Sequence, residues 1–345
     1  MVSQSSNLTS ISGYRRLDAD EITNPLSSRQ FSLDVLTGLS EKPKRLPSRY
    51  FYDDEGSRLF SAICDNGDYY PTRSETEILE TYLDQILDQV GNTRPINVVD
   101  LGAGDGRKTM VFLDRCSARG IDAQFVPIDI SEGAMRDLVE KMGNERPELS
   151  VQGIVADYFD GLHWLSQSKD RLNLVLFLGS NIGNFNKYQA RVFLRQLWEA
   201  LNPHDLLFTG FDLKKDIDIL LRAYNDSEGL TARFNLNLLT RINRELGANF
   251  DTNRFRHYGT YDVQSGAMES YLVSLAWQSV YIDSLHQTFE FEPFEAVHTE
   301  YSYKFLETDI EELAAATDFR PIGHWYDSRH WFTNHLWRVE KSVPR

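Results

Sequence analysis

The chain has 345 residues, of which 41% are hydrophobic and 12% aromatic, values typical of a globular protein. Its length fits one large or two modest domains, and either can bury a sizeable core. The formal net charge of −15 predicts an acidic surface. Such a surface repels phosphate backbones, so we expect no nucleic-acid partner and favour a small zwitterionic or cationic substrate.

The cysteines and the N-terminal residues further restrict the class of protein and its localisation. Cys64 and Cys116 are well separated, and we expect both to be reduced, although one disulfide is arithmetically possible. Because the sequence has no CxxC motif or Cys/His cluster, we expect no metal. The start MVSQSSNLTS lacks the charged and apolar regions of a signal peptide, and no apolar run approaches the ~20 residues of a membrane span. We therefore expect a cytoplasmic protein without a membrane partner.

The first third of the chain predicts an arm followed by helices. Residues up to about 29 are polar and rich in serine, which is typical of a loose arm. Apolar spacing predicts a short helix over 31–39 and another over 57–63, separated by the breaker-rich KPKRLPSRYFYDDEGS. After the loop NGDYYPTR, Ser74 and Glu77 have the spacing of a capping box, so we expect a strong helix to begin at Ser74.

From residue 96 onward, short apolar segments alternate with helical patterns of ten or more residues. Strands are expected over 96–101, 123–128, 150–155, 172–178 and 205–211. Helices are expected over 109–118, 133–142 and 188–201. This alternation predicts an α/β fold with a doubly wound parallel sheet.

The rhythm changes after residue 212. Helices are expected over 216–224 and 230–246, and segments 261–282 and 287–305 then alternate as antiparallel strands. We interpret this region as a second, inserted element beside the parallel sheet. The tail from 318 predicts further strands that close the sheet edge.

A glycine-rich turn follows the first of these strands. In INVVDLGAGDGRKT, Gly102, Gly104 and Gly106 lie between an apolar strand and a helix, where a ligand can approach the backbone. The third glycine comes one residue too early for the dinucleotide fingerprint GxGxxG. Asp100, just before the turn, is placed to pair with the ammonium group of a methionine moiety. The pattern favours S-adenosyl-L-methionine over a nicotinamide cofactor. The alternative is an ordinary glycine-rich βα turn without a ligand.

Acidic residues after the next two strands strengthen this interpretation. Asp129 ends its strand where a carboxylate can accept hydrogen bonds from ribose hydroxyls. Asp157 is placed to accept from the adenine amino group while Tyr158 flanks the ring. Lys108 can approach the cofactor carboxylate, although a solvated lysine at a helix start is nearly as common. Each residue alone has an ordinary explanation, but matching acids at successive strand ends indicate a cofactor site.

The strand 172–178 runs into NIGNF, which places Asn181 and Asn184 where ligands bind open α/β sheets. Together, VDLGAGDGRKT, FLGSNIGNF, AYND followed by FNLNLLTRINRELGANFD, and TEYSYKF resemble the histidine Nα-methyltransferases of ergothioneine biosynthesis. The resemblance runs from about residue 46 to the C-terminus. It implies trimethylation of the α-amine of L-histidine to hercynine. It also implies a Rossmann-like class I methyltransferase sheet with an inserted α+β substrate-binding domain.

The resemblance also implies roles for individual residues. Asn184 and Tyr224 should hold the substrate carboxylate, while Glu300 and Ser302 should bind the imidazole. The residues that it assigns to the cofactor are Gly102, Lys108, Asp129 and Asp157.

Two tyrosines should border the amine. Methyl transfer from a sulfonium mainly requires positioning of a neutral amine, and the pocket must accommodate each added methyl group. Aromatic walls from Tyr52 and Tyr69 would also tolerate the final quaternary ammonium through cation–π attraction. The chain departs from some bacterial members at Ser270, where those carry a large apolar side chain after the glutamate. A smaller polar residue at this substrate position would widen or rehydrate the pocket.

The resemblance divides the chain into four parts. They are an N-terminal arm with part of the substrate-binding domain (1–75), the cofactor-binding domain (76–214), the inserted remainder of the substrate-binding domain (215–304) and the C-terminal part of the methyltransferase domain (305–345). One chain of this kind can enclose a small substrate, so we expect a monomer. Two alternatives remain: the same chemistry on another aromatic or modified-histidine amino acid, and a non-catalytic sensor of the cofactor or an amino acid.

Overall fold

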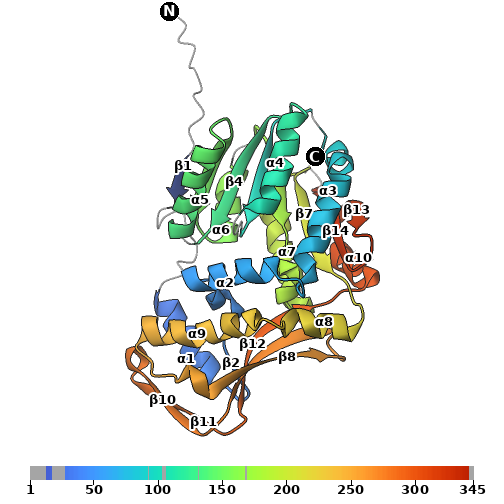
Figure 1. Cartoon of the computed structure of the whole chain (residues 1–345). Helices are drawn as coiled ribbons and strands as arrows, with labels where there is room; N and C mark the ends of the chain where they lie inside the picture. The colour runs from blue at the N-terminus through green and yellow to red at the C-terminus, as the bar shows by residue number, and fades with distance from the viewer. Residues whose placement is uncertain are drawn as a thin grey trace, which may run out of the picture.

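The structure is a computed structural model, and it describes residues 13–17, 28–91, 93–102, 106–130, 132–167 and 169–341. Figure 1 shows a large sheet flanked by helices and, beneath it, a smaller sheet crossed by helix α9. Among the described residues, no helix is both long and apolar enough to cross a membrane.

The larger sheet has eight strands within the described ranges, in the order β1-β5-β4-β3-β6-β7-β14-β13. Their bounds are β1 (Gly13–Arg16), β3 (Ile96–Leu101), β4 (Ala123–Asp129), β5 (Ser150–Val155), β6 (Leu172–Phe177), β7 (Leu206–Asp212), β13 (Phe319–Tyr326) and β14 (Phe332–Val339). The strands from β1 to β7 are parallel, whereas β14 pairs antiparallel with both β7 and β13. The five expected strands and the doubly wound α/β fold are confirmed, with a topological switch point between β3 and β6.

Helices cover both faces of this sheet. They are α3 (Tyr70–Val90), α4 (Arg107–Ala118), α5 (Glu132–Glu145), α6 (Tyr158–Ser166), α7 (Lys187–Ala200) and α10 (Glu307–Ala316). All six residues of β3 are buried, because Val98 packs into the core on one face and Val99 into the core on the other. The expected helices are confirmed within three residues, and α6 and α10 are additional.

Helix α3 corrects one expectation. It begins at Tyr70, four residues before the predicted capping box, and carries a proline in its first turn. Ser74 therefore lies inside the helix, where its hydroxyl donates to the Asp327 carboxylate at 3.1 Å. The Glu77 carboxylate accepts a backbone N–H from the same β13–β14 loop at 2.8 Å. The capping-box interpretation was wrong because both polar side chains serve a tertiary contact.

The smaller sheet has the strand order β2-β12-β9-β8. This part of the fold comprises β2 (Lys44–Arg45), β8 (Phe255–Asp262), β9 (Ala267–Ser274), β12 (Ala296–Tyr303), the hairpin β10 (Gln278–Ile282) and β11 (Gln287–Phe291), and helices α1 (Ser28–Ser40), α2 (Asp54–Asp65), α8 (Ile217–Tyr224) and α9 (Leu230–Leu246). Short 3-10 turns are η1 (Ser48–Phe51), η2 (Asn181–Asn184), η3 (Thr252–Arg254) and η4 (Asp283–Leu285).

Segments far apart in the chain share one core beneath the large sheet. Phe51, before α2, lies 4.7 Å from Phe234 of α9, measured between ring centroids. Leu238 of α9 and Leu272 of β9 belong to the same buried cluster. The N-terminal segment thus packs with the region after residue 215, as the resemblance implies, while the domain limits themselves stay a prediction.

The described part of the expected N-terminal arm includes a strand. Residues Gly13–Arg16 form β1, which extends the sheet by pairing parallel with β5. The rest of the first 27 residues, apart from Leu17, lies outside the described residues. The arm therefore contributes an edge strand that its polar composition did not indicate.

Candidate active site

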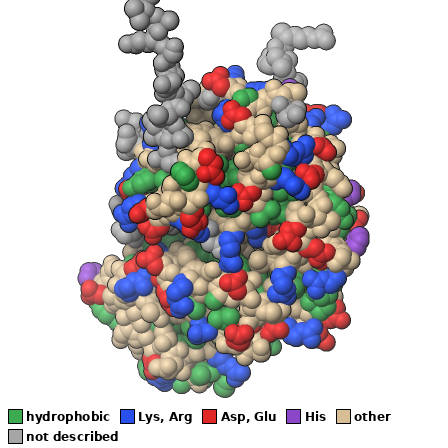
Figure 2. Space-filling view, turned by 45° about the horizontal axis from the view of Figure 1, so that its top comes forward, with side chains coloured by type: hydrophobic (Ala, Val, Ile, Leu, Met, Phe, Trp, Pro, Cys, Tyr) green, Lys and Arg blue, Asp and Glu red, His purple; other side chains and the backbone are tan. Residues whose placement is uncertain are grey.

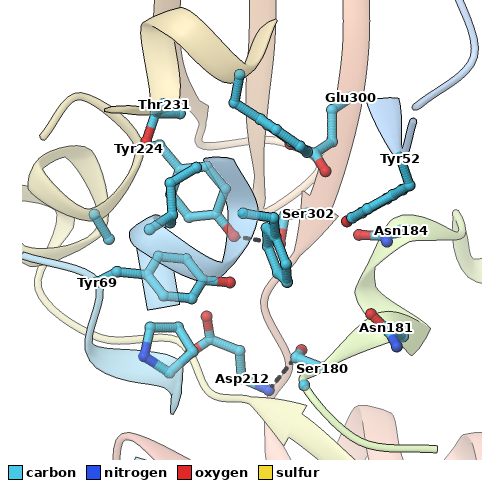
Figure 3. A pocket seen from close by; sticks show the side chains of 16 residues that line it. Tyr52, Tyr69, Ser180, Asn181, Asn184, Asp212, Tyr224, Thr231, Glu300 and Ser302 are labelled. Atoms are coloured by element: carbon cyan, nitrogen blue, oxygen red, sulfur yellow. Dashed lines mark hydrogen bonds between the residues drawn. The ribbon is translucent and has the colours of Figure 1, made fainter. Parts of the chain in front are cut away.

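One pocket lies beyond the carboxyl ends of β6 and β7, and residues of helices α2, α8 and α9 and of strand β12 line it (Figure 3). It brings together six of the seven side chains that the sequence assigned to the substrate; the exception is Ser270. The lining residues are Tyr52, Phe60, Ile63, Tyr69, Pro71, Gly179, Ser180, Asn181, Asn184, Asp212, Ala223, Tyr224, Thr231, Phe234, Glu300 and Ser302.

Aromatic rings form one part of the wall. The Tyr52 ring meets Phe60 and Phe234 edge-on at 5.5 and 5.6 Å, and the Tyr69 ring lies 6.4 Å from Tyr224. Tyr52 is 40% exposed as a residue, but its hydroxyl turns into the pocket toward Asn184 (Figure 3). Burial raises the pKa of both the Tyr52 and the Tyr69 phenol well above the usual value. Both phenols therefore stay neutral hydrogen-bonding groups at physiological pH.

Two asparagines lie across the pocket from Tyr69 and Tyr224, on the side of Tyr52 (Figure 3). They belong to η2, the turn that follows β6, and Asn181 and Asn184 are its first and last residues. The turn is fastened to the next strand, since the Ser180 hydroxyl accepts the Asp212 N–H at 3.1 Å. Side-chain amides on a fixed turn can accept from an amine or donate to a carboxylate.

Glu300 supplies a carboxylate at the edge of the pocket (Figure 3). Burial raises its pKa to about 7, and the positive charge of Lys304 limits this rise. At neutral pH the side chain is therefore poised between carboxylic acid and carboxylate. Its ionised form can accept a hydrogen bond from an imidazole N–H.

Beneath the pocket is a buried network that the sequence did not reveal. The Tyr224 hydroxyl donates to Ser302 Oγ at 2.6 Å, and the Lys304 ammonium donates to both oxygens, at 2.9 and 2.8 Å. Lys304 Nζ also lies 2.9 Å from Asp212 Oδ2. Burial alone would lower the pKa of Lys304, but the Asp212 carboxylate raises it above the usual value. The lysine is thus held as a cation.

Asp212 is the centre of this network. It is the last residue of β7, and its side chain also contacts the Lys215 ammonium and accepts the Tyr70 hydroxyl at 2.7 Å. Asp212 thereby joins the large sheet, helix α3 and strand β12. The available signal was a charged residue ending an otherwise apolar strand, but nothing in the sequence pairs it with Lys304.

Ser270 differs from its expected role. It lies directly opposite Glu300 in the β9–β12 pair, but it is not among the pocket-lining residues. The residue is 1% exposed, and its hydroxyl finds no hydrogen-bond partner among the described residues. The structure therefore places Ser270 behind the wall, one strand further from the ligand.

The glycine turn lies at the end of β3. Gly102 has a φ of +78°, and a Cβ added there would come within 2.7 Å of the Tyr158 hydroxyl. Gly104 lies outside the described residues. Asp100 is buried beside the turn and accepts the Thr109 hydroxyl, and burial raises its pKa to about 6. Only glycine adopts this backbone without strain, and the missing side chain lets the Tyr158 hydroxyl approach the turn.

The acids after the next strands lie side by side. Asp129, which ends β4, pairs with Val155 at the end of β5, so Asp157 follows two residues beyond it. One oxygen of Asp157 accepts the Phe159 and Asp160 N–H groups and caps helix α6. Burial raises the pKa of Asp157.

Lys108 connects the glycine turn to the substrate pocket. In this structure its ammonium lies 2.5 Å from Glu75, whose side chain is fully buried. Glu75 also accepts the Gly179 N–H at 2.8 Å and the Asn334 amide at 2.9 Å. The sequence did not single out Glu75, which holds the start of α4 and the loop after β6 together.

These features fit S-adenosyl-L-methionine. The turn brings backbone without a side chain next to Tyr158, and acidic side chains lie at or just after the ends of three adjacent strands, where ribose and adenine would find acceptors. Among the described residues, no group of three or more His, Cys, Asp or Glu side chains could hold a metal ion.

A doubly wound sheet with this turn at its switch point, next to a pocket for a small polar ligand, defines a class I S-adenosylmethionine-dependent methyltransferase. The family model described as "Histidine-specific methyltransferase, SAM-dependent" matches residues 31–339. The chain belongs to this family.

Its relatives include named enzymes. The "Histidine N-alpha-methyltransferase" of Mycolicibacterium smegmatis is 35% identical over 294 residues, which cover 85% of this chain and 90% of the relative. The "Ergothioneine biosynthesis protein 1" of Schizosaccharomyces pombe is 30% identical, covering 83% of this chain but 38% of that longer protein. The "4-dimethylallyltryptophan N-methyltransferase easF" of Claviceps fusiformis is 29% identical, covering 56% of each chain.

Proposed function

We propose that this enzyme methylates the α-amine of L-histidine three times in succession and releases hercynine. The observation that carries the proposal is the convergence of six of the seven assigned substrate residues on one pocket. The histidine N-alpha-methyltransferase of M. smegmatis, similar over most of its length, supports the choice of substrate.

The chemistry assigned to each side chain follows from its state. S-adenosyl-L-methionine, when bound, supplies the electrophilic methyl group. The neutral phenols of Tyr52 and Tyr69 orient the amine and provide aromatic faces for the quaternary product. Asn184 and Tyr224 hold the carboxylate. Ionised Glu300 accepts the imidazole N–H, so a substrate without that N–H would leave a buried carboxylate unpaired.

The cofactor assignments are part of the same proposal. Gly102 gives the methionine moiety access to the backbone, Asp129 accepts from ribose, and Asp157 with Tyr158 receives the adenine. Lys108 can move from Glu75 to the cofactor carboxylate. Gly104, outside the described residues, is assigned to the same turn.

A second candidate is the same reaction on another aromatic amino acid. The similarity to an enzyme named as a dimethylallyltryptophan N-methyltransferase favours testing it. The retained Glu300 and Ser302 at the pocket favour histidine instead, since this pair offers an acceptor and a hydroxyl to a ring with two nitrogens.

The deciding experiment uses purified enzyme with labelled S-adenosyl-L-methionine and a panel of amino acids, with products identified by mass spectrometry. We expect histidine to gain one, two and finally three methyl groups. Methylation of another amino acid but not of histidine would show that histidine is not the substrate. Cofactor binding without any methylation would favour the sensor.

We also propose a cytoplasmic monomer with the domain limits 75, 214 and 304, and without a nucleic-acid partner. On the face in Figure 2, acidic and basic side chains are interspersed, as expected for a protein that does not bind a phosphate backbone there. Light scattering after size exclusion tests the monomer directly.

A further inference from the structure

Lys304 has every hydrogen bond that its ammonium can make. It directly follows β12, and its side chain has no exposed surface. An ammonium group has three donors and no acceptor. Here the three acceptors are the hydroxyl oxygens of Tyr224 and Ser302 and the carboxylate of Asp212, all within 3.0 Å. Lys304 therefore cannot bind a ligand, and its effect must pass through its partners.

The lysine restricts what the two hydroxyls offer. It occupies a lone pair on Tyr224 Oη and another on Ser302 Oγ, and the 2.6 Å bond between these oxygens uses one of their two protons. Because Tyr224 is the donor in that bond, the hydroxyl proton that remains is that of Ser302, and both residues line the pocket. The pair consequently offers a ligand one hydroxyl proton, and a hydrogen-bond acceptor is the group that fits it.

The position of the charge points in the same direction. Two buried lysines, Lys304 and Lys215, share the carboxylate of Asp212, and of the two it is Lys304 that contacts both hydroxyl oxygens. The acids that face this cluster are Glu300, which lines the same pocket, and Asp327, which acts on Lys215 from the other side. The positive charge of Lys304, directly behind the donor, favours an acceptor that is also an anion. In an amino acid that group is the α-carboxylate.

We propose that Lys304 is a positioning residue that makes the α-carboxylate an obligatory feature of the substrate. It does so by fixing the Tyr224–Ser302 pair so that the free Ser302 proton is a donor, and by placing positive charge behind the pair. The proposal rests on the proposed function in one respect, namely that the substrate carboxylate meets this pair.

The test compares histidine with histidinamide, which lacks the negative charge. For K304M we expect kcat/KM with histidine to fall by about 10- to 100-fold, mainly through KM, because a charge-assisted contact is lost. With histidinamide the change should stay below about threefold. The preference for the carboxylate then collapses, whereas equal losses with both substrates would show a purely structural role and overturn the proposal.

K215M is the matched control, because Lys215 contacts Asp212 but neither hydroxyl. Its histidine-to-histidinamide ratio should match that of the wild type, and a collapse there would contradict a specific role for Lys304. Binding of S-adenosylhomocysteine reports whether each variant is folded. If K304M is unfolded, S302A decides, since a full carboxylate preference without the Ser302 hydroxyl also overturns the proposal.

The two proposals fail in different ways. If the wild type methylates neither histidine nor histidinamide, the proposed function is wrong. Calorimetry then compares the amino acid that the panel identifies with its own amide, on wild type and K304M. A carboxylate preference that K304M loses supports the role of Lys304 for that substrate, and one that K304M keeps rejects it.

Discussion

Glu300 lies directly opposite Ser270 across the β12–β9 pair, so both side chains emerge on the same face of the smaller sheet. Glu300 reaches the pocket, while Ser270 lies behind it with a buried hydroxyl that lacks a partner among the described residues. The two residues therefore have different consequences when changed.

Removing the Ser270 hydroxyl should have little effect on catalysis. S270A eliminates an unsatisfied buried polar group, so we expect the free energy of unfolding to rise by about 1 kcal/mol or to stay unchanged. The KM for histidine should remain within about twofold, because the side chain does not line the pocket. Denaturant unfolding and steady-state kinetics check both values. A large increase in KM would instead show that the hydroxyl contacts the substrate.

We expect Glu300 to favour ligand binding but to lower the free energy of unfolding at neutral pH. Its pKa is raised by burial from 4.5 to about 7, so the folded state binds a proton more tightly than the unfolded state. The wild type therefore loses stability as pH rises from about 4.5 to 7. E300Q avoids this loss, worth about 3 kcal/mol above pH 7.

Thermal unfolding at two pH values measures this difference. We expect the Tm of E300Q to exceed that of the wild type by roughly 5 °C near pH 8 and by much less near pH 5. E312Q, at an exposed position on α10, is the control and should show no pH-dependent difference. An equal shift of E300Q at both pH values would argue against a buried titrating carboxyl.

The sequence predicted those strands and helices whose apolar pattern is strong and whose ends carry turn-forming residues. Strand β3 was clear from the sequence because four of its six residues, INVVDL, are apolar and turn-forming residues flank it on both sides. Helix α6 was missed because aromatic residues and a glycine weaken its helical pattern, whereas the structure shows Asp157 capping it. Strand β1 was missed because its four residues, GYRR, are an exposed edge with no apolar alternation.

The site shows a similar division. Glu300 and Tyr224 could be assigned to the pocket from the sequence, because each lies in a short motif, TEYSYKF or AYND. The ion pair between Asp212 and Lys304 could not be predicted from the sequence. The two residues are 92 positions apart and meet only when β7 and β12 pack together. The prediction that Ser270 contacts the substrate was wrong, because its position next to Glu269 in the sequence does not show whether its side chain reaches the pocket.

Glu75 should be essential to the cofactor side of the site. E75Q leaves the Lys108 ammonium without its carboxylate partner, which should cost about 3–5 kcal/mol of folding free energy. It also weakens the hold on the Gly179 backbone, so affinity for S-adenosylhomocysteine should fall by about tenfold or more. Chemical unfolding and calorimetry measure the two losses.

E80Q provides the comparison for E75Q, since Glu80 is exposed on the same helix. It should change the free energy of unfolding by less than about 0.5 kcal/mol and leave cofactor affinity unaltered. Should E75Q bind S-adenosylhomocysteine as tightly as the wild type, the ion pair would be structural only.

Gly102 and Gly91 separate backbone strain from loss of space. Both have positive φ, but a Cβ at Gly102 would come within 2.7 Å of the Tyr158 hydroxyl, whereas one at Gly91 would meet nothing within 4 Å. G91A should cost about 1–2 kcal/mol of stability from strain alone. G102A adds displacement of Tyr158, so we expect a comparable or larger stability loss together with at least about tenfold weaker binding of S-adenosylhomocysteine. If calorimetry finds the same affinity for G102A and G91A, Tyr158 is not part of the cofactor site.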